Sequence, residues 1–98
     1  MHEKGHTPMA ERTVLIGSTH GLHARPARLF TQAASDSGLE VTLAAQGGTV
    51  ADAASILGVI SLGINFGDEV TLTAEGTDAD LVLDTLAGLL TTDHDAQA

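Results

Sequence analysis

Apolar positions along the chain follow the period of a strand in some segments and the period of a helix in others, and turn residues separate these segments. A short β-branched run over 13–16, which ends at Gly17-Ser18, predicts a first strand. Helical spacing predicts a helix over 24–37, with Gly38 as its terminator. The apolar face of this helix is expected to consist of Ala24, Ala27, Phe30, Ala33 and Ala34.

The middle of the chain predicts a β-hairpin. Apolar and polar residues alternate over 39–44, as in a strand with one buried face. Gly47-Gly48 then turns the chain into a short strand over 49–51, which completes the hairpin. The residues expected on the buried face of the first hairpin strand are Leu39, Val41 and Leu43.

A short helix, a strand and a last helix complete the pattern. Asp52 or Ser55 is suited to cap the short helix, which ends near Leu62 before Gly63. The buried face of the following strand is expected to be Val70, Leu72 and Ala74, and that of the last helix Ala79, Val82, Leu83, Leu86, Leu89 and Leu90. The order βαββαβα predicts an α+β fold of two layers, a sheet covered on one face by helices.

Charge is distributed unevenly along the chain and narrows the classes of partner. The chain of 98 residues suits one domain; it has 4 basic and 13 acidic residues, and every basic residue lies within the first 28 positions. A net charge of −9 disfavours binding to nucleic acid or to an anionic membrane surface. The polar first ten residues lack a secretory signal and no apolar stretch is long enough to cross a bilayer, so we expect a cytoplasmic location.

The candidate chemistry lies in Gly21-Leu22-His23-Ala24-Arg25-Pro26-Ala27, between the first strand and the first helix. Gly21 permits a sharp turn, and Pro26 is tolerated in the first turn of a helix. The positive end of the helix and Arg25 oppose protonation of His23, and a neutral imidazole can attack phosphorus. The same positive groups would then hold the phosphoryl oxygens. The motif therefore predicts a histidine that accepts and passes on a phosphoryl group.

Together with a second motif, Ala54-Ser55-Ile56-Leu57-Gly58-Val59-Ile60-Ser61-Leu62-Gly63, this segment resembles the histidine-containing phosphocarrier (HPr) family of the bacterial sugar phosphotransferase system. The resemblance covers residues 11–90 and implies an open-faced two-layer sandwich with an antiparallel sheet, flanked by flexible segments at 1–10 and 91–98. It implies that phosphorylated enzyme I, itself charged by phosphoenolpyruvate, transfers a phosphoryl group to Nδ1 of His23. A histidine of a sugar-specific IIA component would then receive it. Such a protein is a monomeric carrier, with no cofactor or metal, and not an enzyme.

The resemblance also assigns roles to other residues. Arg25 would neutralise the phosphate, and backbone N–H groups at the start of the first helix, from Ala24 onward, would receive it. Ser55 aligns with a serine that an ATP-dependent HPr kinase phosphorylates in some bacteria, although a serine at a helix start is also an ordinary cap. Partner docking would use Arg28, Ile56, Leu57 and Ile60, although some apolar residues of the short helix must belong to the core.

Two alternatives remain open from the sequence. An HPr-like domain of a nitrogen-related or regulatory phosphorelay would share the chemistry of His23 and differ in its partners. A metal-binding or sensing module would instead use several histidines, although no cysteine accompanies them. Its ligands would be His20 and His23, with His2, His6 or His94.

Overall fold

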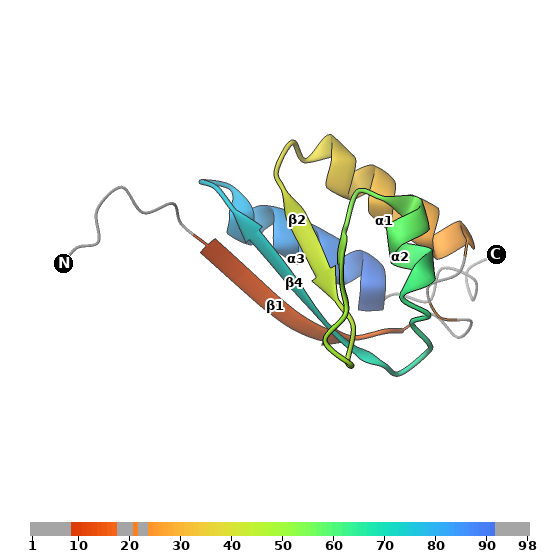
Figure 1. Cartoon of the computed structure of the whole chain (residues 1–98). Helices are drawn as coiled ribbons and strands as arrows, with labels where there is room; N and C mark the ends of the chain where they lie inside the picture. Colours follow the sequence, from red (N-terminus) through yellow and green to blue (C-terminus); the bar gives the residue numbers. More distant parts are fainter. Residues whose placement is uncertain (1–8, 18–20, 22–23, 92–98) are drawn as a thin grey trace.

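The computed structural model describes residues 9–17, 21 and 24–91, and its elements follow the predicted order βαββαβα (Figure 1). The strands are β1 (Met9–Leu15), β2 (Val41–Ala44), β3 (Val50–Asp52) and β4 (Glu69–Glu75). The helices are α1 (Ala24–Asp36), α2 (Ile56–Ser61) and α3 (Ala79–Thr91). None of the described helices is long and apolar enough to cross a membrane.

The four strands form one antiparallel sheet in the order β1-β4-β2-β3. β4 lies inside the sheet, because β1 pairs with one of its edges, Met9 opposite Glu75, and β2 with the other, Val41 opposite Ala74. β2 and β3 form the hairpin predicted from Gly47-Gly48, where Gly48 has a left-handed φ of +94°. The sequence predicts β4, the strand over 69–75, from its alternation, and the structure shows that it pairs with both β1 and β2.

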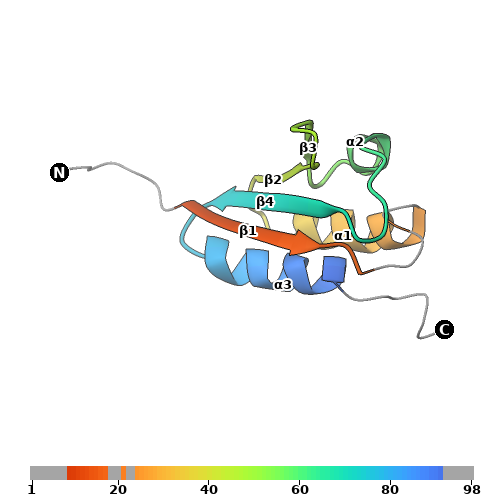
Figure 2. The ribbon, with the colours of Figure 1, turned by 90° about the horizontal axis from the view of Figure 1, so that it is seen from below.

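Helices α1 and α3 cover one face of this sheet, and Figure 2 shows both beneath β1, β4 and β2 while the opposite face is open. α3 packs against β1 and β4, and α1 packs against α3 and α2. This arrangement confirms the predicted two-layer α+β fold. It also places the first turn of α1 and the last turn of α3 at the same end of the molecule (Figure 1).

The core lies between the sheet and the two long helices. Leu43 of β2 and Leu72 of β4 are fully buried, and Phe30 of α1 is the largest side chain with no exposed surface. Complete burial of such a side chain stabilises the folded state by roughly 1.5–3 kcal/mol relative to exposure. Further buried members of the predicted apolar faces are Ala27, Ala34, Val41, Val70, Ala74, Ala79, Leu83, Leu86 and Leu90.

Several element boundaries differ from the sequence prediction. β1 ends at Leu15 and not at 16, α1 ends at Asp36 and not at 37, and β3 spans Val50–Asp52 and not 49–51. β2 begins at Val41 and not at 39, so Leu39 precedes the strand and is only half-buried.

Two further differences lie at the ends of the domain. β1 begins at Met9, so residues 9 and 10, which the sequence assigns to an N-terminal extension, pair with β4, and Ala10 is buried. Thr91, expected in the C-terminal tail, is the last residue of α3. The sequence does not reveal the start of β1, because the charged residues Glu11 and Arg12 break the apolar alternation by which a strand is recognised.

Arg12 is accommodated in β1 because its side chain reaches α3. Its Nη2 lies 3.1 Å from Oδ1 of Asp80 and its Nε lies 3.0 Å from Oδ1 of Asp84. The hydrogen bond that Arg12 donates to Asp80, and then the one that it donates to Asp84, raises the pKa of Arg12 above its ordinary value. A raised pKa on a cation adds stability that is lost only as the pH rises through that pKa, so this tether between β1 and α3 persists throughout the neutral range.

Candidate functional site

The motif singled out in the sequence joins β1 to α1. Of its residues the structure describes Gly21 and 24–27, with the side chain of Ala24 excepted, whereas Leu22 and His23 lie outside the described residues. α1 begins at Ala24, the residue that directly follows His23 in the sequence. The site is therefore described from Gly21 and from the residues of α1 that follow His23 in the sequence.

The first turn of α1 is suited to hold an anion. The N–H groups of a helix's first turn have no intrahelical acceptor, and the helix dipole places partial positive charge there. No acidic residue occupies the first turn of this 13-residue helix, so no carboxylate of that turn opposes the effect. Pro26 is buried within the first turn, where its missing N–H removes no helical hydrogen bond. Its predicted role at the helix start is confirmed.

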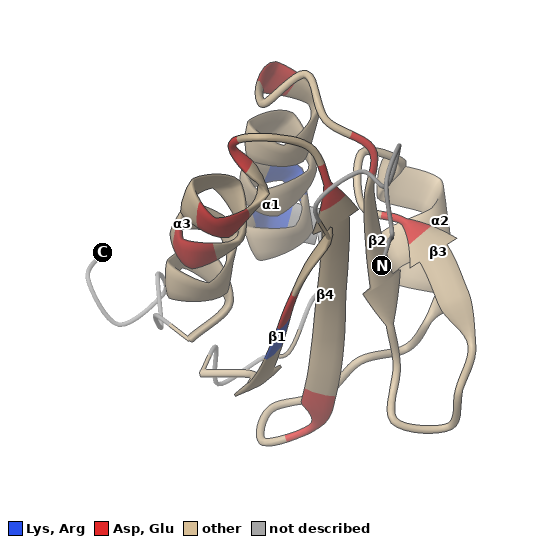
Figure 3. Ribbon diagram, turned by 90° about the vertical axis from the view of Figure 1, so that its left-hand side faces the viewer, with Lys and Arg blue, Asp and Glu red and all other residues tan. Residues whose placement is uncertain are grey.

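Arg25 and Arg28 add two exposed cations to the same end of α1. They are three residues apart and so lie on one side of the helix. Figure 3 shows basic residues on α1 and on β1, while acidic residues are spread over most other parts of the ribbon. Within the described ranges carboxylates pair with Arg12 and with neither arginine of α1. The basic end of α1 is thus a local exception on an acidic molecule.

Gly21 fixes the chain two residues before His23. It has a left-handed φ of +74°, and a Cβ at this position would lie 2.5 Å from the carbonyl oxygen of Ile64 and 2.9 Å from Cα of Asn65. Only glycine satisfies both requirements, since it has no Cβ and enters the left-handed region at little cost. The special backbone conformation that the sequence predicts at Gly21 is confirmed, and the structure adds the packing partner of this residue, the backbone of 64–65.

Gly17 plays a comparable role at the other end of the loop, and the sequence alone showed it only as the end of a strand. Its N–H donates a hydrogen bond to the carbonyl oxygen of Leu90 at 2.9 Å. A Cβ at Gly17 would lie 1.9 Å from the carbonyl oxygen of Thr91, so the last turn of α3 fits against this residue only because it has no side chain. No local pattern signals this contact, because its two partners are distant in the sequence.

Helix α2 places apolar side chains beside α1, against which it packs. Leu57 is 79% exposed and Ile60 is 39% exposed, as the predicted docking role requires. Ile56, which the sequence assigns to the same role, is half-buried and packs against the core. Ser55 is the N-cap of α2, and its Oγ accepts a hydrogen bond from the N–H of Gly58 at 3.1 Å.

A metal site finds no support in the described part of the chain. There, no group of three or more histidine, aspartate or glutamate side chains lies close enough to hold a metal ion. The histidines of the metal-binding alternative, His2, His6, His20, His23 and His94, all lie outside the described residues.

Comparisons with known proteins agree with one another. The sequence profile of the family described as PTS HPr component phosphorylation site matches residues 10–92. Phosphocarrier protein HPr of Streptomyces coelicolor is 44% identical over 82 residues, which cover 84% of this chain and 88% of that protein. Phosphocarrier protein NPr of Shewanella violacea is 41% identical over 80 residues, which cover 82% of this chain and 87% of that protein. The crystal structure of a phosphocarrier protein HPr from Bacillus anthracis superposes with a TM-score of 0.79 at 36% identity, covering 84% of this chain and 96% of that one.

Proposed function

The chain belongs to the HPr family of the phosphotransferase system, and from this premise we propose that it carries a phosphoryl group on His23 between phosphorylated enzyme I and a sugar-specific IIA component. The observation that carries the proposal is the start of α1. This helix begins at the residue after His23, has no acidic residue in its first turn and bears Arg25 there. Such a helix end stabilises an anion on the residue that precedes it.

The proposed transfer balances as a substitution at phosphorus. The lone pair on Nδ1 of neutral His23 attacks the phosphorus of the donor's phosphohistidine, and the P–N bond of the donor breaks as that of His23 forms. The N–H groups of Ala24 and Arg25 and the guanidinium of Arg25 donate hydrogen bonds to the phosphoryl oxygens, whose negative charge they offset. The second transfer repeats these steps with the acceptor's histidine as the nucleophile. The chain is therefore consumed and regenerated as a reagent, without a cofactor or a metal.

We propose that partners dock around the first turn of α1 and the exposed side of α2. Arg28, Leu57 and Ile60 are exposed there, and a transient interface combines such apolar residues with charge at its rim. Ile56 contributes by supporting α2 from the core side, since it is half-buried. The carrier would act as a monomer in the cytoplasm, without nucleic acid or membrane partners.

Ser55 is proposed as a regulatory phosphorylation site for an ATP-dependent HPr kinase. Its Oγ caps α2 one residue before Ile56 and two before the exposed Leu57. A phosphate there would bring close to two negative charges beside the docking surface and would oppose the approach of a phosphorylated partner.

A second phosphorelay remains the alternative function. The relative named phosphocarrier protein NPr is 41% identical, close to the 44% of the relative named HPr. Both relatives are phosphocarriers, so this alternative shares the proposed chemistry of His23 and concerns only which donor and acceptor the chain serves.

Intact mass measurement tests the proposed function. We expect the native chain, incubated with phosphoenolpyruvate and enzyme I, to gain one acid-labile phosphoryl group that a IIA component then removes. The His23→Ala variant should gain none, whereas His20→Ala, which changes the other histidine of the loop, should gain one. Arg25→Ala should be phosphorylated roughly ten- to a hundredfold more slowly, because one donor to the transferred group is lost.

The same mass measurement tests the proposed regulatory site. With ATP and an HPr kinase, the native chain should gain an acid-stable adduct that is absent from Ser55→Ala.

Absence of an adduct on the native chain, with an enzyme I that is active on its own carrier, would contradict the proposed function. An adduct on His23→Ala would move the site to another residue. Transfer only from the donor of a different phosphorelay would favour the alternative.

A further inference from the structure

Residues 65–68 form a tight turn with Phe66 at its tip. The N–H of Asp68 donates to the carbonyl oxygen of Asn65 at 3.0 Å, and Oδ2 of Asp68 accepts from the N–H of Asn65 at 2.8 Å. Gly67, the third residue, has a φ of +83°, as a type II turn requires. Two hydrogen bonds and a suitable glycine thus hold the conformation of this turn.

The turn is also fixed to the body of the protein. The N–H of Gly67 donates to the carbonyl oxygen of Ile16, and the N–H of Ile16 donates to that of Asp68, each at 2.9 Å. Ile64, which enters the turn, is buried, and the backbone of 64–65 is the surface on which Gly21 packs. The turn is therefore the immediate neighbour of the chain that leads into His23.

Phe66 is 58% exposed on this rigid support. The chain has two phenylalanines and no other aromatic residue, and the other, Phe30, is fully buried. An exposed ring on a fixed backbone loses little conformational freedom when a partner covers it, and aromatic residues in such positions dominate the binding energy of many interfaces. The ring thus adds a third exposed apolar side chain to Leu57 and Ile60 of α2.

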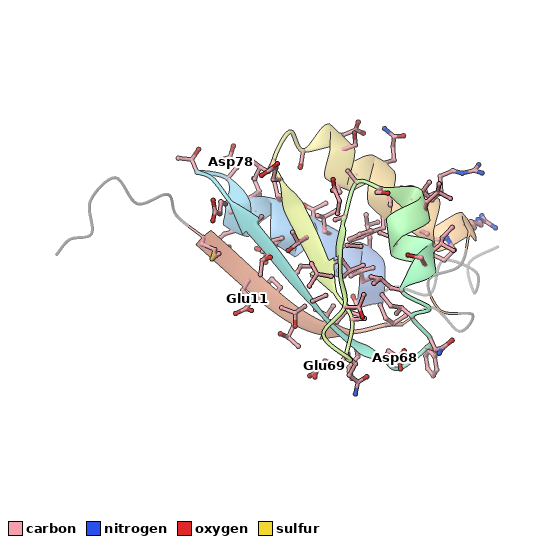
Figure 4. The ribbon with its side chains drawn as sticks, viewed as in Figure 1. Glu11, Asp68, Glu69 and Asp78 are labelled. Atoms are coloured by element: carbon pink, nitrogen blue, oxygen red, sulfur yellow. The ribbon has the colours of Figure 1, made fainter. Side chains whose placement is uncertain are left out.

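Charge beside Phe66 indicates the chemistry of its partner. Asp68 and Glu69 lie where the turn enters β4, and Figure 4 shows both at the same end of the sheet, away from Glu11 and Asp78. A surface complementary to this region needs an apolar pocket with basic residues at its rim.

We propose that Phe66 is an anchor residue that inserts into an apolar pocket, rimmed by basic side chains, on the protein that donates the phosphoryl group to His23. The inference rests on the proposed function and adds to it a specificity-determining residue. The donor is favoured over the acceptors because one preformed ring fits one pocket, and a carrier meets the same donor in every cycle but several acceptors. Phe66 acts in docking and not in the transfer itself.

Steady-state kinetics with separate donor and acceptor test this inference. For Phe66→Ala we expect the KM for transfer from the phosphorylated donor to rise about tenfold, with kcat within about twofold of the native value. The KM of Phe66→Leu, which keeps an apolar side chain, should lie between that of the native chain and that of Phe66→Ala. Glu69→Gln should raise the KM by about threefold through the lost rim contact. Leu81→Ala is the matched control, because Leu81 is 68% exposed near the start of α3, at the end of that helix opposite to Gly17.

A structural role for Phe66 would show in different measurements. We expect the thermal midpoint of Phe66→Ala and the rate at which its phosphohistidine hydrolyses to match those of the native chain. A donor KM within twofold of native, or a KM that rises for the acceptor instead, would overturn the proposal. A native chain that is never phosphorylated would contradict the proposed function itself, so the two failures are distinguishable.

Discussion

At the scale of single residues, two glycines allow the chain between β1 and α1 to pack closely against other parts of the backbone. Gly17 and Gly21 stand on either side of segment 18–20, and each lies against a backbone carbonyl, of Thr91 and of Ile64 respectively. The two glycines differ in the reason that they are required. Gly21 needs both a left-handed φ and space, whereas Gly17 has no left-handed φ and needs space alone.

This difference makes Gly17→Ala a clean steric experiment. Alanine can adopt the backbone conformation of Gly17, but its Cβ would collide with the carbonyl oxygen of Thr91 at 1.9 Å. We expect the free energy of unfolding to fall by about 1–3 kcal/mol because the end of α3 must move. Urea denaturation followed by circular dichroism measures this value, since the chain has neither Trp nor Tyr.

Gly47→Ala is the control, because Gly47 also lacks a left-handed φ and has no atom within 4 Å of the added Cβ. Its free energy of unfolding should stay within about 0.5 kcal/mol of the native value. Equal stabilities of the two variants would show that α3 does not pack against Gly17 as described.

At the scale of elements, the long strands and helices are held by the shared core, whereas α2 depends on its surroundings. Six residues are too few for an isolated helix to be stable in water, so α2 requires its N-cap Ser55 and the buried Val59. Ile56 packs partly against the core, and Leu57 and Ile60 are exposed. The sequence identifies the helix, and its packing determines which apolar residues face a partner.

The core pair across β2 and β4 provides the test at this scale. Leu43 and Leu72 are opposite each other in the register and both are fully buried. Replacing either by alanine should lower the free energy of unfolding by about 2–5 kcal/mol, since the change leaves a cavity. Because the two side chains are neighbours, the effects should not add in the double variant.

Urea denaturation of the two single variants, the double variant and the exposed control Leu81→Ala would measure these effects. The control should differ from the native protein by less than about 0.5 kcal/mol. Native-like stability of both single variants would be incompatible with the register between β2 and β4.

At the scale of the whole molecule, the dominant feature is an excess of negative charge with a basic end at the start of α1. The net charge of −9 produces repulsion that opposes folding, and the cation of β1 is already paired with α3. No carboxylate among the described residues pairs with the cations of α1. These cations therefore stand out in the overall field, which favours the approach of an anionic group to that end of the molecule.

Added salt should consequently stabilise the fold. When NaCl rises from about 10 mM to about 0.5 M, the screening length falls well below the size of the molecule and the repulsion weakens. We expect the thermal midpoint to increase across this range. Chloride is the suitable anion, because sulfate stabilises proteins by a separate exclusion effect. A midpoint that falls instead would mean that the ion pairs of Arg12 with Asp80 and Asp84 outweigh the general repulsion.

The sequence by itself determined the order of the elements, their buried faces and the motif around His23, because these depend on local periodicity, turn residues and the requirements of a helix start. It assigned Leu43, Leu72 and Ala27 to the buried faces and Pro26 to the first turn, and the structure confirms each. These features are local, since each depends on residues that are close to one another in the sequence.

Only the tertiary structure decided which distant segments support the site. The start of β1 at Met9, the half-burial of Ile56 and the contact of Gly17 with α3 depend on partners far away in the sequence. The exposure of Phe66 belongs with them, since a ring next to a glycine turn is compatible with either burial or exposure. Local patterns record the conformation that a segment prefers, whereas burial and close approach depend on what the rest of the chain places beside it.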